Sequence, residues 1–138
     1  MRKADLMNIG TVADQSGVPT KSIRYYESIG LIQPAERRAN GYRSYSLLDM
    51  RTLAFIKRAR SLGFSVEEVR ELLDLWRDTN RKSATVKAMT LRHIEILDRK
   101  IEELQSMRKA LADLVTHCRG DSRPDCPILK DLEDGLDR

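Results

Sequence analysis

Two cysteines, Cys118 and Cys126, lie near the C-terminal end of the 138-residue chain and are separated by seven residues. Thiolates are soft ligands, and two of them can hold Cu(I), Ag(I) or Au(I) in a linear site, whereas structural Zn(II) prefers four protein ligands. Because the chain has no third cysteine, the pair favours a monovalent soft ion. Two other interpretations remain open: the thiols are incidental buried side chains, or they form a reversible disulfide in a redox sensor.

His117 directly precedes the first cysteine and could be a third metal ligand or the base of a cysteine nucleophile. Adjacent residues at a helix end point in different directions, and the sequence has no Gly-rich phosphate loop or paired-carboxylate motif. The sequence therefore does not predict an enzyme. Because cations are favoured at helix C-termini, we expect the imidazole to interact with the last carbonyl groups of a helix.

A second group of residues is basic and aromatic, and it lies in the N-terminal third of the chain. Residues 1–77 carry 13 basic and 9 acidic side chains, while residues 78–138 carry 12 of each, so the positive excess is entirely N-terminal. Arg can recognise guanine in the major groove, and Lys, Ser and Tyr can hold phosphates. The residues predicted to contact double-stranded DNA are Lys21, Ser22, Arg24, Tyr25, Tyr26, Arg37, Arg38, Tyr42 and Arg43. Tyr25 has an alternative role in the core, because adjacent aromatic residues on a helix cannot both face the groove.

The elements that must position these residues are mainly helical, because Gly and Pro are few and apolar residues recur every three or four positions. Short helices are expected over residues 9–16 and from an N-cap at Thr20 to Gly30, joined by a turn at Gly17. This is the outline of a helix-turn-helix. The dipeptide Asn40-Gly41 suits a two-residue turn, so residues 36–45 are expected to form a β-hairpin wing.

Further helices are expected over residues 48–62 and, after the capping box formed by Ser65 and Glu68, to about Trp76. Trp76 is expected to fill the core between this domain and the following helix. Residues 83–117 contain no Pro or Gly, and their apolar side chains step by three or four along about 50 Å of helix. This apolar series needs a partner, which is either a second copy of the chain in a coiled coil or the chain's own domain.

The sequence has no run of about 18 uncharged apolar residues and no apolar segment at its N-terminus. We therefore expect no contact with a membrane and a cytoplasmic location, where cysteines are usually reduced.

Several motifs of the chain closely resemble the winged-helix domain of the MerR family of transcription regulators. They are Ile9-Gly10-Thr11-Val12-Ala13, Ile23-Arg24-Tyr25-Tyr26-Glu27 and Asn40-Gly41-Tyr42-Arg43, and the resemblance continues through Phe64-Ser65 to Pro127-Ile128. It implies a homodimer with antiparallel long helices that distorts promoter DNA for RNA polymerase when its effector is bound. It also implies that Arg24 contacts bases and that Lys21, Tyr26 and Arg43 lie near phosphates.

The cysteine loop is similar to that of the CueR-like group, the MerR-family sensors of monovalent copper, silver and gold. Both cysteines match, and the motif Asp125-Cys126-Pro127-Ile128 is shared with the group. The divalent sensors carry a third cysteine at the start of the long helix, where this chain has Ser83. The resemblance thus implies that Ser83 marks selectivity for monovalent ions, with Cu(I) as the effector and Ag(I) or Au(I) as possible alternatives.

These observations predict a mainly α fold in three parts. A winged helix-turn-helix DNA-binding domain is expected over residues 1–77, an antiparallel coiled-coil dimerisation helix over 78–117, and a metal-binding loop with a short helix over 118–138. The expected function is activation of metal efflux or detoxification genes in response to Cu(I). The alternative is a thiol-disulfide redox regulator of the same fold. A drug sensor is not predicted, because some 20 residues after Cys118 cannot enclose a small molecule.

Overall fold

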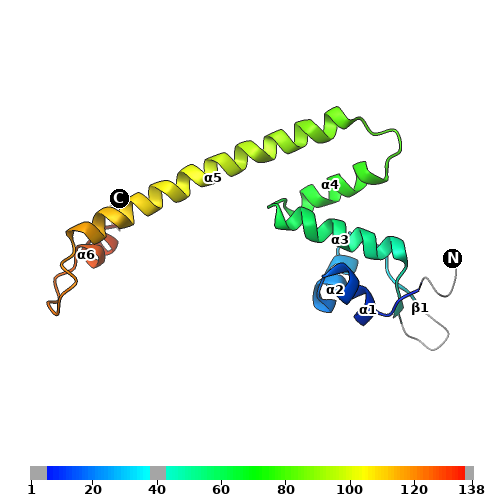
Figure 1. Cartoon of the computed structure of the whole chain (residues 1–138), viewed down its shortest axis with the longest axis horizontal. Helices are drawn as coiled ribbons and strands as arrows, with labels where there is room; N and C mark the ends of the chain where they lie inside the picture. The colour runs from blue at the N-terminus through cyan, green and yellow to red at the C-terminus, as the bar shows by residue number, and fades with distance from the viewer. Residues whose placement is uncertain (1–5, 38–42, 136–138) are drawn as a thin grey trace. The chain divides into compact units, whose positions relative to one another are not determined.

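The computed structural model describes residues 6–37 and 43–135, with the backbone alone at positions 36 and 37. Within these ranges the elements follow in the order α1 (Ile9–Ser16), α2 (Thr20–Ser28), β1 (Glu36–Arg37), β2 (Arg43–Ser44), α3 (Leu47–Ser61), α4 (Val66–Arg77), α5 (Ser83–His117) and α6 (Pro127–Asp134) (Figure 1). The predicted mainly helical fold is confirmed. The chain divides into two compact units, residues 1–86 and 87–138, which are described separately below.

Helices α1 and α2 form the helix-turn-helix. The Asn8 side chain caps α1 by accepting a hydrogen bond of 2.8 Å from the Thr11 amide. Gly17 ends α1 with a φ of 75°, a left-handed conformation that suits glycine, and its amide donates to the Ala13 carbonyl. The predicted N-cap at Thr20 is wrong: Thr20 is already helical, and the cap is Pro19, which has no side chain that can accept a hydrogen bond.

Helix α2 ends at Ser28, two residues before the predicted end at Gly30. The hydroxyl group of Ser28 donates to the Tyr25 carbonyl at 2.6 Å, which satisfies one of the last carbonyl groups of the helix. Gly30 follows with a φ of 77° and turns the chain toward the wing. Gly30 therefore lies in the turn that follows the helix and is not its last residue.

Two short strands form the base of the predicted wing. Strands β1 and β2 pair antiparallel, with Glu36 opposite Ser44 and Arg37 opposite Arg43. Tyr45 extends the pairing to the N-terminal segment, because its amide and carbonyl groups each bond to Met7 at 2.7 Å. The predicted turn at Asn40-Gly41, and the predicted DNA contacts Arg38 and Tyr42, lie outside the described residues.

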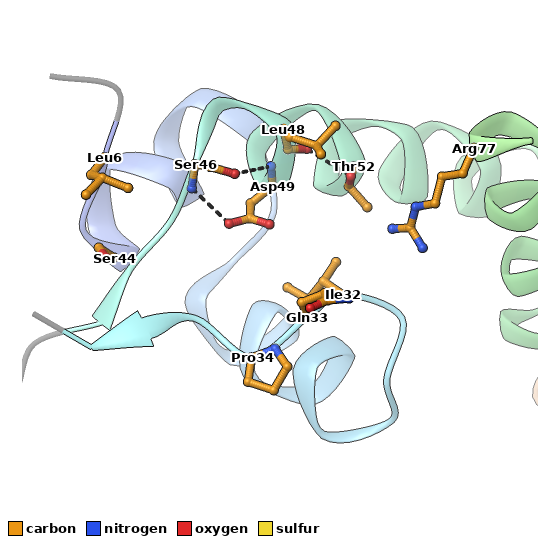
Figure 2. A pocket seen from close by; sticks show the side chains of 10 residues that line it. All are labelled: Leu6, Ile32, Gln33, Pro34, Ser44, Ser46, Leu48, Asp49, Thr52 and Arg77. Carbon is orange, nitrogen blue, oxygen red and sulfur yellow. Dashed lines mark hydrogen bonds between the residues drawn. The ribbon is translucent and has the colours of Figure 1, made fainter. Parts of the chain in front are cut away.

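Capping boxes start the next two helices. The Ser46 side chain accepts from the Asp49 amide at 3.0 Å, and Asp49 in turn accepts from the Ser46 amide at 2.8 Å (Figure 2). This reciprocal pair starts α3 one residue earlier than the sequence predicted. The predicted capping box of Ser65 and Glu68 is confirmed, with bonds of 3.1 and 2.9 Å.

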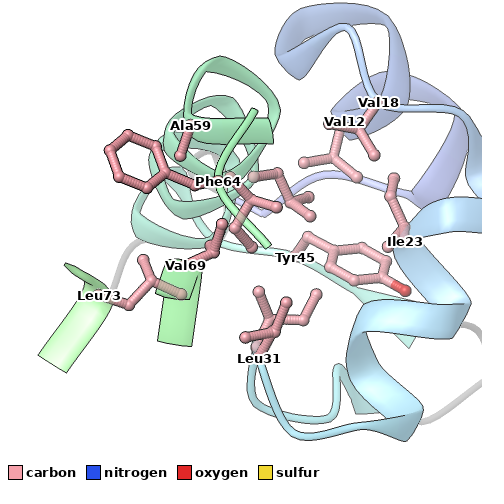
Figure 3. Close-up of a cluster of buried hydrophobic side chains, with 12 residues drawn as sticks. Val12, Val18, Ile23, Leu31, Tyr45, Ala59, Phe64, Val69 and Leu73 are labelled. Carbon is pink, nitrogen blue, oxygen red and sulfur yellow. The ribbon is translucent and has the colours of Figure 1, made fainter. Parts of the chain in front are cut away.

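The core of the first unit is shared by all four of its helices and by the residue after β2 (Figure 3). Its fully buried side chains include Val12, Ile23, Leu31, Tyr45, Leu53, Ile56, Val69 and Leu73. Arg70 of α4 also donates to the Ile29 carbonyl at 2.8 Å and so fastens α4 to the chain just after α2. Trp76 stacks on Phe55, with ring centroids 4.8 Å apart and planes at 14°. Helix α2 is therefore held on a packed base.

A groove of about 510 Å³ opens between the start of α3 and the segment 32–34. Figure 2 shows the Arg77 side chain at one end of this groove and Leu6 at the other. Leu48 lines it with 65% of its surface exposed. The polar groups of Ser46 and Asp49 at its wall are already engaged in the capping box.

The second unit is dominated by α5, an unbroken helix of 35 residues that matches the Pro- and Gly-free range 83–117, while residues 78–82 of the predicted dimerisation helix are not helical. Its described buried side chains are Met89 and His93. Its large apolar side chains at helical spacing are about half exposed or more, namely Leu91, Ile94, Ile101, Leu104, Met107, Leu111 and Val115. We call this set the α5 apolar face. Among the described helices, none is both long enough and apolar enough to cross a membrane.

We expect Gly17→Ala to lower the free energy of unfolding by about 1–2 kcal/mol, because an L-residue is strained at positive φ. The added methyl group would also meet the side chain of Lys57. Thermal or urea unfolding measures the change. Gly10→Ala is the matched control, because Gly10 is helical and its new methyl group would make only an ordinary contact with Asn8. A control as unstable as Gly17→Ala would contradict the role assigned to the turn.

Candidate DNA-binding surface and metal loop

Helix α2 presents one side to the core and another to solvent. Ile23 is fully buried, whereas Lys21, Arg24 and Tyr25 are exposed. Spacings of three and four residues place these three side chains on one face of the helix. Ser22 is half-buried at the side of the helix. The exposed face of α2 therefore combines two cations with an aromatic hydroxyl group.

The two adjacent tyrosines have different surroundings. Tyr25 is 51% exposed, while Tyr26 is half-buried and packs against the core. Their ring centroids lie 5.8 Å apart, with the planes tilted by 49°. The alternative that Tyr25 is the core aromatic is wrong, and Tyr26 occupies that place, because Tyr25 shares its face with the exposed cations.

Glu27, at the end of α2, joins this helix to the wing. Its carboxylate accepts a hydrogen bond from the Tyr45 hydroxyl group and pairs with the Arg43 guanidinium group at 3.1 Å. The Glu27 side chain is 9% exposed, so its carboxylate is largely shielded from water at both contacts. Sequence reasoning did not assign this role to Glu27, because its two partners lie 16 and 18 positions later in the chain and no local pattern links them to it.

The environment of Glu27 strongly affects the titration of Tyr45. Burial raises the pKa of the Tyr45 hydroxyl group to about 12, and the hydrogen bond to Glu27 and its negative charge act in the same direction. The nearby Arg43 guanidinium group opposes the shift but does not cancel it. Tyr45 therefore remains a neutral hydrogen-bond donor under ordinary conditions.

The other basic residues of the surface are only partly described. Arg43 retains 39% exposure of its side chain although it pairs with Glu27. Arg37 lies in β1, where the structure describes its backbone. Lys57 of α3 was not predicted: its side chain lies beside Gly17, at the turn that precedes α2. Only the tertiary packing brings this cation to the turn, since 40 positions separate them in the chain numbering.

The second candidate site starts where α5 ends. The Nδ1 atom of His117 bonds to the Asp113 carbonyl at 2.7 Å, so the predicted interaction of the imidazole with the last helical carbonyl groups is confirmed. The Cys118 amide continues the pattern with a bond of 3.1 Å to the Val115 carbonyl. Gly120 then adopts a φ of 64° and turns the chain away from the helix. Cys118 is thereby fixed at the helix end.

The loop brings the two cysteines together. Both are free and half-buried, and an interaction with Cys118 is one of the causes that lower the pKa of Cys126. Cys126 is the N-cap residue of α6, and Pro127 is the first helical residue, a position that proline favours. The Cys126 side chain makes no capping hydrogen bond. The pKa of Cys126 is nevertheless lowered, mainly by the nearby backbone amide of Leu129 and also by that of Ile128, whereas burial acts in the opposite direction.

A lowered cysteine pKa favours the thiolate, which is the form that binds metal ions. Within residues 6–37 and 43–135, no group of three or more His, Cys, Asp and Glu side chains is arranged to hold an ion. The two free thiols of the loop, Cys118 and Cys126, are the side chains considered as ligands of a soft ion. Two sulfur donors suit a soft ion of low coordination number.

Two family models match the chain, and both end before the cysteine loop. The family model described as MerR HTH family regulatory protein matches residues 7–76, and the model described as MerR, DNA binding matches residues 50–114. The first covers the helix-turn-helix and wing, and the second covers α3 to most of α5.

Curated proteins and solved structures are similar over nearly the whole chain. Heavy metal-dependent transcription regulator 2 of Rhizobium meliloti (strain 1021) is 54% identical over 94% of this chain and 88% of its own length. The regulator CueR of Escherichia coli O157:H7 is 45% identical over 91% of this chain and 93% of its own. The crystal structure of PbrR691 from Ralstonia metallidurans CH34 in complex with lead(II) is 29% identical, with a TM-score of 0.78, and covers 91% of this chain and 98% of its own.

We expect one of the four tyrosines to ionise near pH 12, about two units above the ordinary value, in a spectrophotometric titration of the folded protein. Tyr45→Phe should remove this late component and leave the others. Because the folded pKa is raised, the neutral Tyr45 stabilises the fold fully below pH 10, and this stabilisation is lost as the pH rises through the folded pKa. The stability difference between the two proteins should therefore shrink above pH 10, and a constant difference would contradict the assignment.

Proposed function

Because the chain belongs to the MerR family of HTH regulatory proteins, we propose that it is a metal-responsive transcription activator whose effector is Cu(I), with Ag(I) or Au(I) as alternatives. As a member of this family it is a DNA-binding regulator and not an enzyme. The observation that carries the proposal is the presence, in one chain, of a helix-turn-helix unit and a loop between α5 and α6 that holds two free cysteines.

The exposed face of α2 is the part of the chain that enters the major groove in this proposal. Arg24 supplies donors for base edges, and Lys21, Ser22 and Tyr25 hold the flanking phosphates or fix the register. Tyr26 packs its ring against the core but keeps part of its surface exposed, and it is proposed to lie near a phosphate at the edge of this face. The wing residues Arg37, Arg38, Tyr42 and Arg43 contact the neighbouring backbone. The Glu27 contact to Arg43 and Tyr45 supports this division of roles, because it ties the wing to α2.

Promoter binding in this proposal requires two copies of the chain. The α5 apolar face is exposed along a helix of 35 residues, and a second α5 packed antiparallel would cover it. Such a homodimer presents two copies of α2 to a pseudo-palindromic promoter, where distortion of the DNA allows RNA polymerase to start at metal efflux or detoxification genes. The proposed dimerisation segment is residues 78–117, between the DNA-binding domain (1–77) and the metal loop (118–138).

Cys118 and Cys126 are the proposed metal ligands. A bound ion would supply two bonds to sulfur, and these would fix the end of α5 to the start of α6. Cys126 is suited to this task because the amides at the start of α6 favour its thiolate. His117 is already engaged with the Asp113 carbonyl group through Nδ1, so two-coordination by sulfur is the simpler arrangement.

Ser83 is the proposed determinant of metal valence. It is exposed at the first position of α5, and at 1.5 Å per residue a 35-residue helix spans about 50 Å. In an antiparallel pair of α5 helices, Ser83 of one chain therefore approaches the loop of the other. A serine there adds no third thiolate, and a divalent ion in the loop remains short of ligands.

One observation favours a second candidate function. Cys118 and Cys126 are free thiols that interact with each other, and such a pair can be oxidised to a disulfide, so a thiol-disulfide redox regulator of the same fold is the alternative. In vitro transcription from the chain's own upstream DNA, titrated with buffered Cu(I), Ag(I), Zn(II) or an oxidant, separates the two. Activation by Cu(I) or Ag(I) under reducing conditions supports the metal function, and activation by oxidant alone supports the redox function.

Arg24→Ala should weaken binding to the specific promoter by about 1–3 kcal/mol and bring it closer to binding of random DNA, because a base contact is lost. Titration of both DNAs at fixed salt measures the change. Arg92→Ala removes the same charge from an exposed position on α5 and serves as the control. An equal loss of affinity for promoter and random DNA would show that Arg24 contacts only the backbone.

Cys118→Ser and Cys126→Ser should each abolish metal-dependent transcription while leaving promoter affinity unchanged, because the thiols lie outside the DNA-binding unit. X-ray absorption of the Cu(I)-loaded protein should show two sulfur neighbours. Ser122→Ala changes an exposed side chain of the same loop and should behave as the wild type. A fit that requires four nitrogen or oxygen neighbours would contradict the bis-thiolate site.

A further inference from the structure

The loop between the two cysteines lacks a packed interior. All residues from 119 to 125 are described, and all of them are exposed. Several of their side chains surround an open hollow of about 240 Å³, which is lined by His117, Arg119, Asp121, Arg123, Asp125 and Pro127. Apolar burial therefore does not fix the shape of this loop within one chain, and polar contacts must do so.

One ion pair stands at the middle of the loop. The carboxylate of Asp121 accepts hydrogen bonds from the Arg123 guanidinium group at 3.0 Å (Nε) and 2.9 Å (Nη2), both to the same oxygen. Its other oxygen accepts from the Arg123 amide at 3.0 Å. One side chain thus fixes both the backbone and the side chain of a residue two positions later.

In the sequence, the ion pair lies at equal distances from the two cysteines. Asp121 follows Cys118 by three residues, and Arg123 precedes Cys126 by three. The contact therefore closes the tip of the loop, while α5 and α6 hold its two ends. A closed tip shortens the flexible segments that join it to Cys118 and to Cys126, and this raises the local concentration of one thiol at the other.

We propose that Asp121 and Arg123 are positioning residues that hold the thiols of Cys118 and Cys126 together before metal binds. This inference rests on the proposed function of the loop, but it concerns the geometry of the free thiols. Neither residue is a metal ligand. In this proposal the closed tip lowers the entropic cost of chelation because it limits the separation of the two sulfur atoms before the metal binds.

The proximity of the thiols is measurable without metal. In glutathione buffers the reduced loop reacts with glutathione disulfide to give the Cys118–Cys126 disulfide and two molecules of glutathione, so the chain is oxidised and glutathione disulfide is reduced. The equilibrium constant has units of concentration and reports the effective concentration of one thiol at the other. Competition with a colorimetric Cu(I) chelator, performed separately, reports the affinity for the metal.

The variants separate the ion pair from the turn. Asp121→Asn keeps an oxygen for the Arg123 amide but removes the charge, whereas Asp121→Ala removes both contacts. Arg123→Gln removes the guanidinium group. We expect the effective concentration to fall about two- to fivefold in Asp121→Asn and in Arg123→Gln, the range that an exposed ion pair supplies, and further in Asp121→Ala.

The double variant Asp121→Asn with Arg123→Gln should lose no more than either single variant, because both changes break one contact. The matched control is the pair Lys130→Gln and Asp134→Asn, which removes the 3.8 Å ion pair of α6 outside the loop and should leave the effective concentration unchanged. Cu(I) affinity should follow the same order. Helix content measured by circular dichroism verifies that all variants are folded.

Each outcome decides the inference. Unchanged effective concentration in the Asp121 and Arg123 variants overturns it, as does an equal fall in the Lys130 and Asp134 control. A fall confined to the loop variants supports it even if the wild-type protein does not bind Cu(I). An absence of Cu(I) binding by the wild-type protein would count against the proposed metal function alone. The failure of that function and the failure of this inference are therefore distinguishable.

Discussion

The contacts of the Glu27 carboxylate with Tyr45 and Arg43 hold α2 and the wing together, and the arrangement of the DNA-binding unit depends on them. Helix α2 and the wing are separate elements, and no strand or helix is shared between them. Glu27 bonds to Tyr45 at the base of the wing and to Arg43 at its surface. A carboxylate that is 9% exposed is costly to leave unpaired, so the two partners are held firmly. The spacing between the basic face of α2 and the wing follows from this constraint.

The two units solve the problem of apolar burial differently. The first unit packs four helices around a shared core, in which Ile23 and Tyr45 are fully buried. The second unit is mainly one long helix, and one helix cannot cover its own apolar face. Side chains such as Leu104, which is 61% exposed, therefore remain available to a partner. The unit that contacts DNA is thus complete in one chain, while the unit proposed to respond to metal is not.

The metal loop combines two helix ends that have opposite polarity. Cys118 follows the C-terminal end of α5, where His117 already engages a carbonyl group. Cys126 stands at the N-terminal end of α6, where amide groups favour its thiolate. Negative charge is stabilised at a helix N-terminus. A metal ion bound to both sulfur atoms would join these two helix ends, so a change in the loop would be transmitted to α6 through its N-cap residue, Cys126.

The sequence by itself determined the helical fold, the bounds of α5 and the capping box at Ser65, since these depend on local patterns of polarity and on side chains that bond to nearby backbone. It also identified the cysteine pair and the basic helix, because the chemistry of those residues depends on their types and spacing. The end of α2, the cap before Thr20 and the different surroundings of Tyr25 and Tyr26 were decided by packing. The Glu27 contacts and the placement of Lys57 join positions distant in the chain, which only the tertiary structure can bring together.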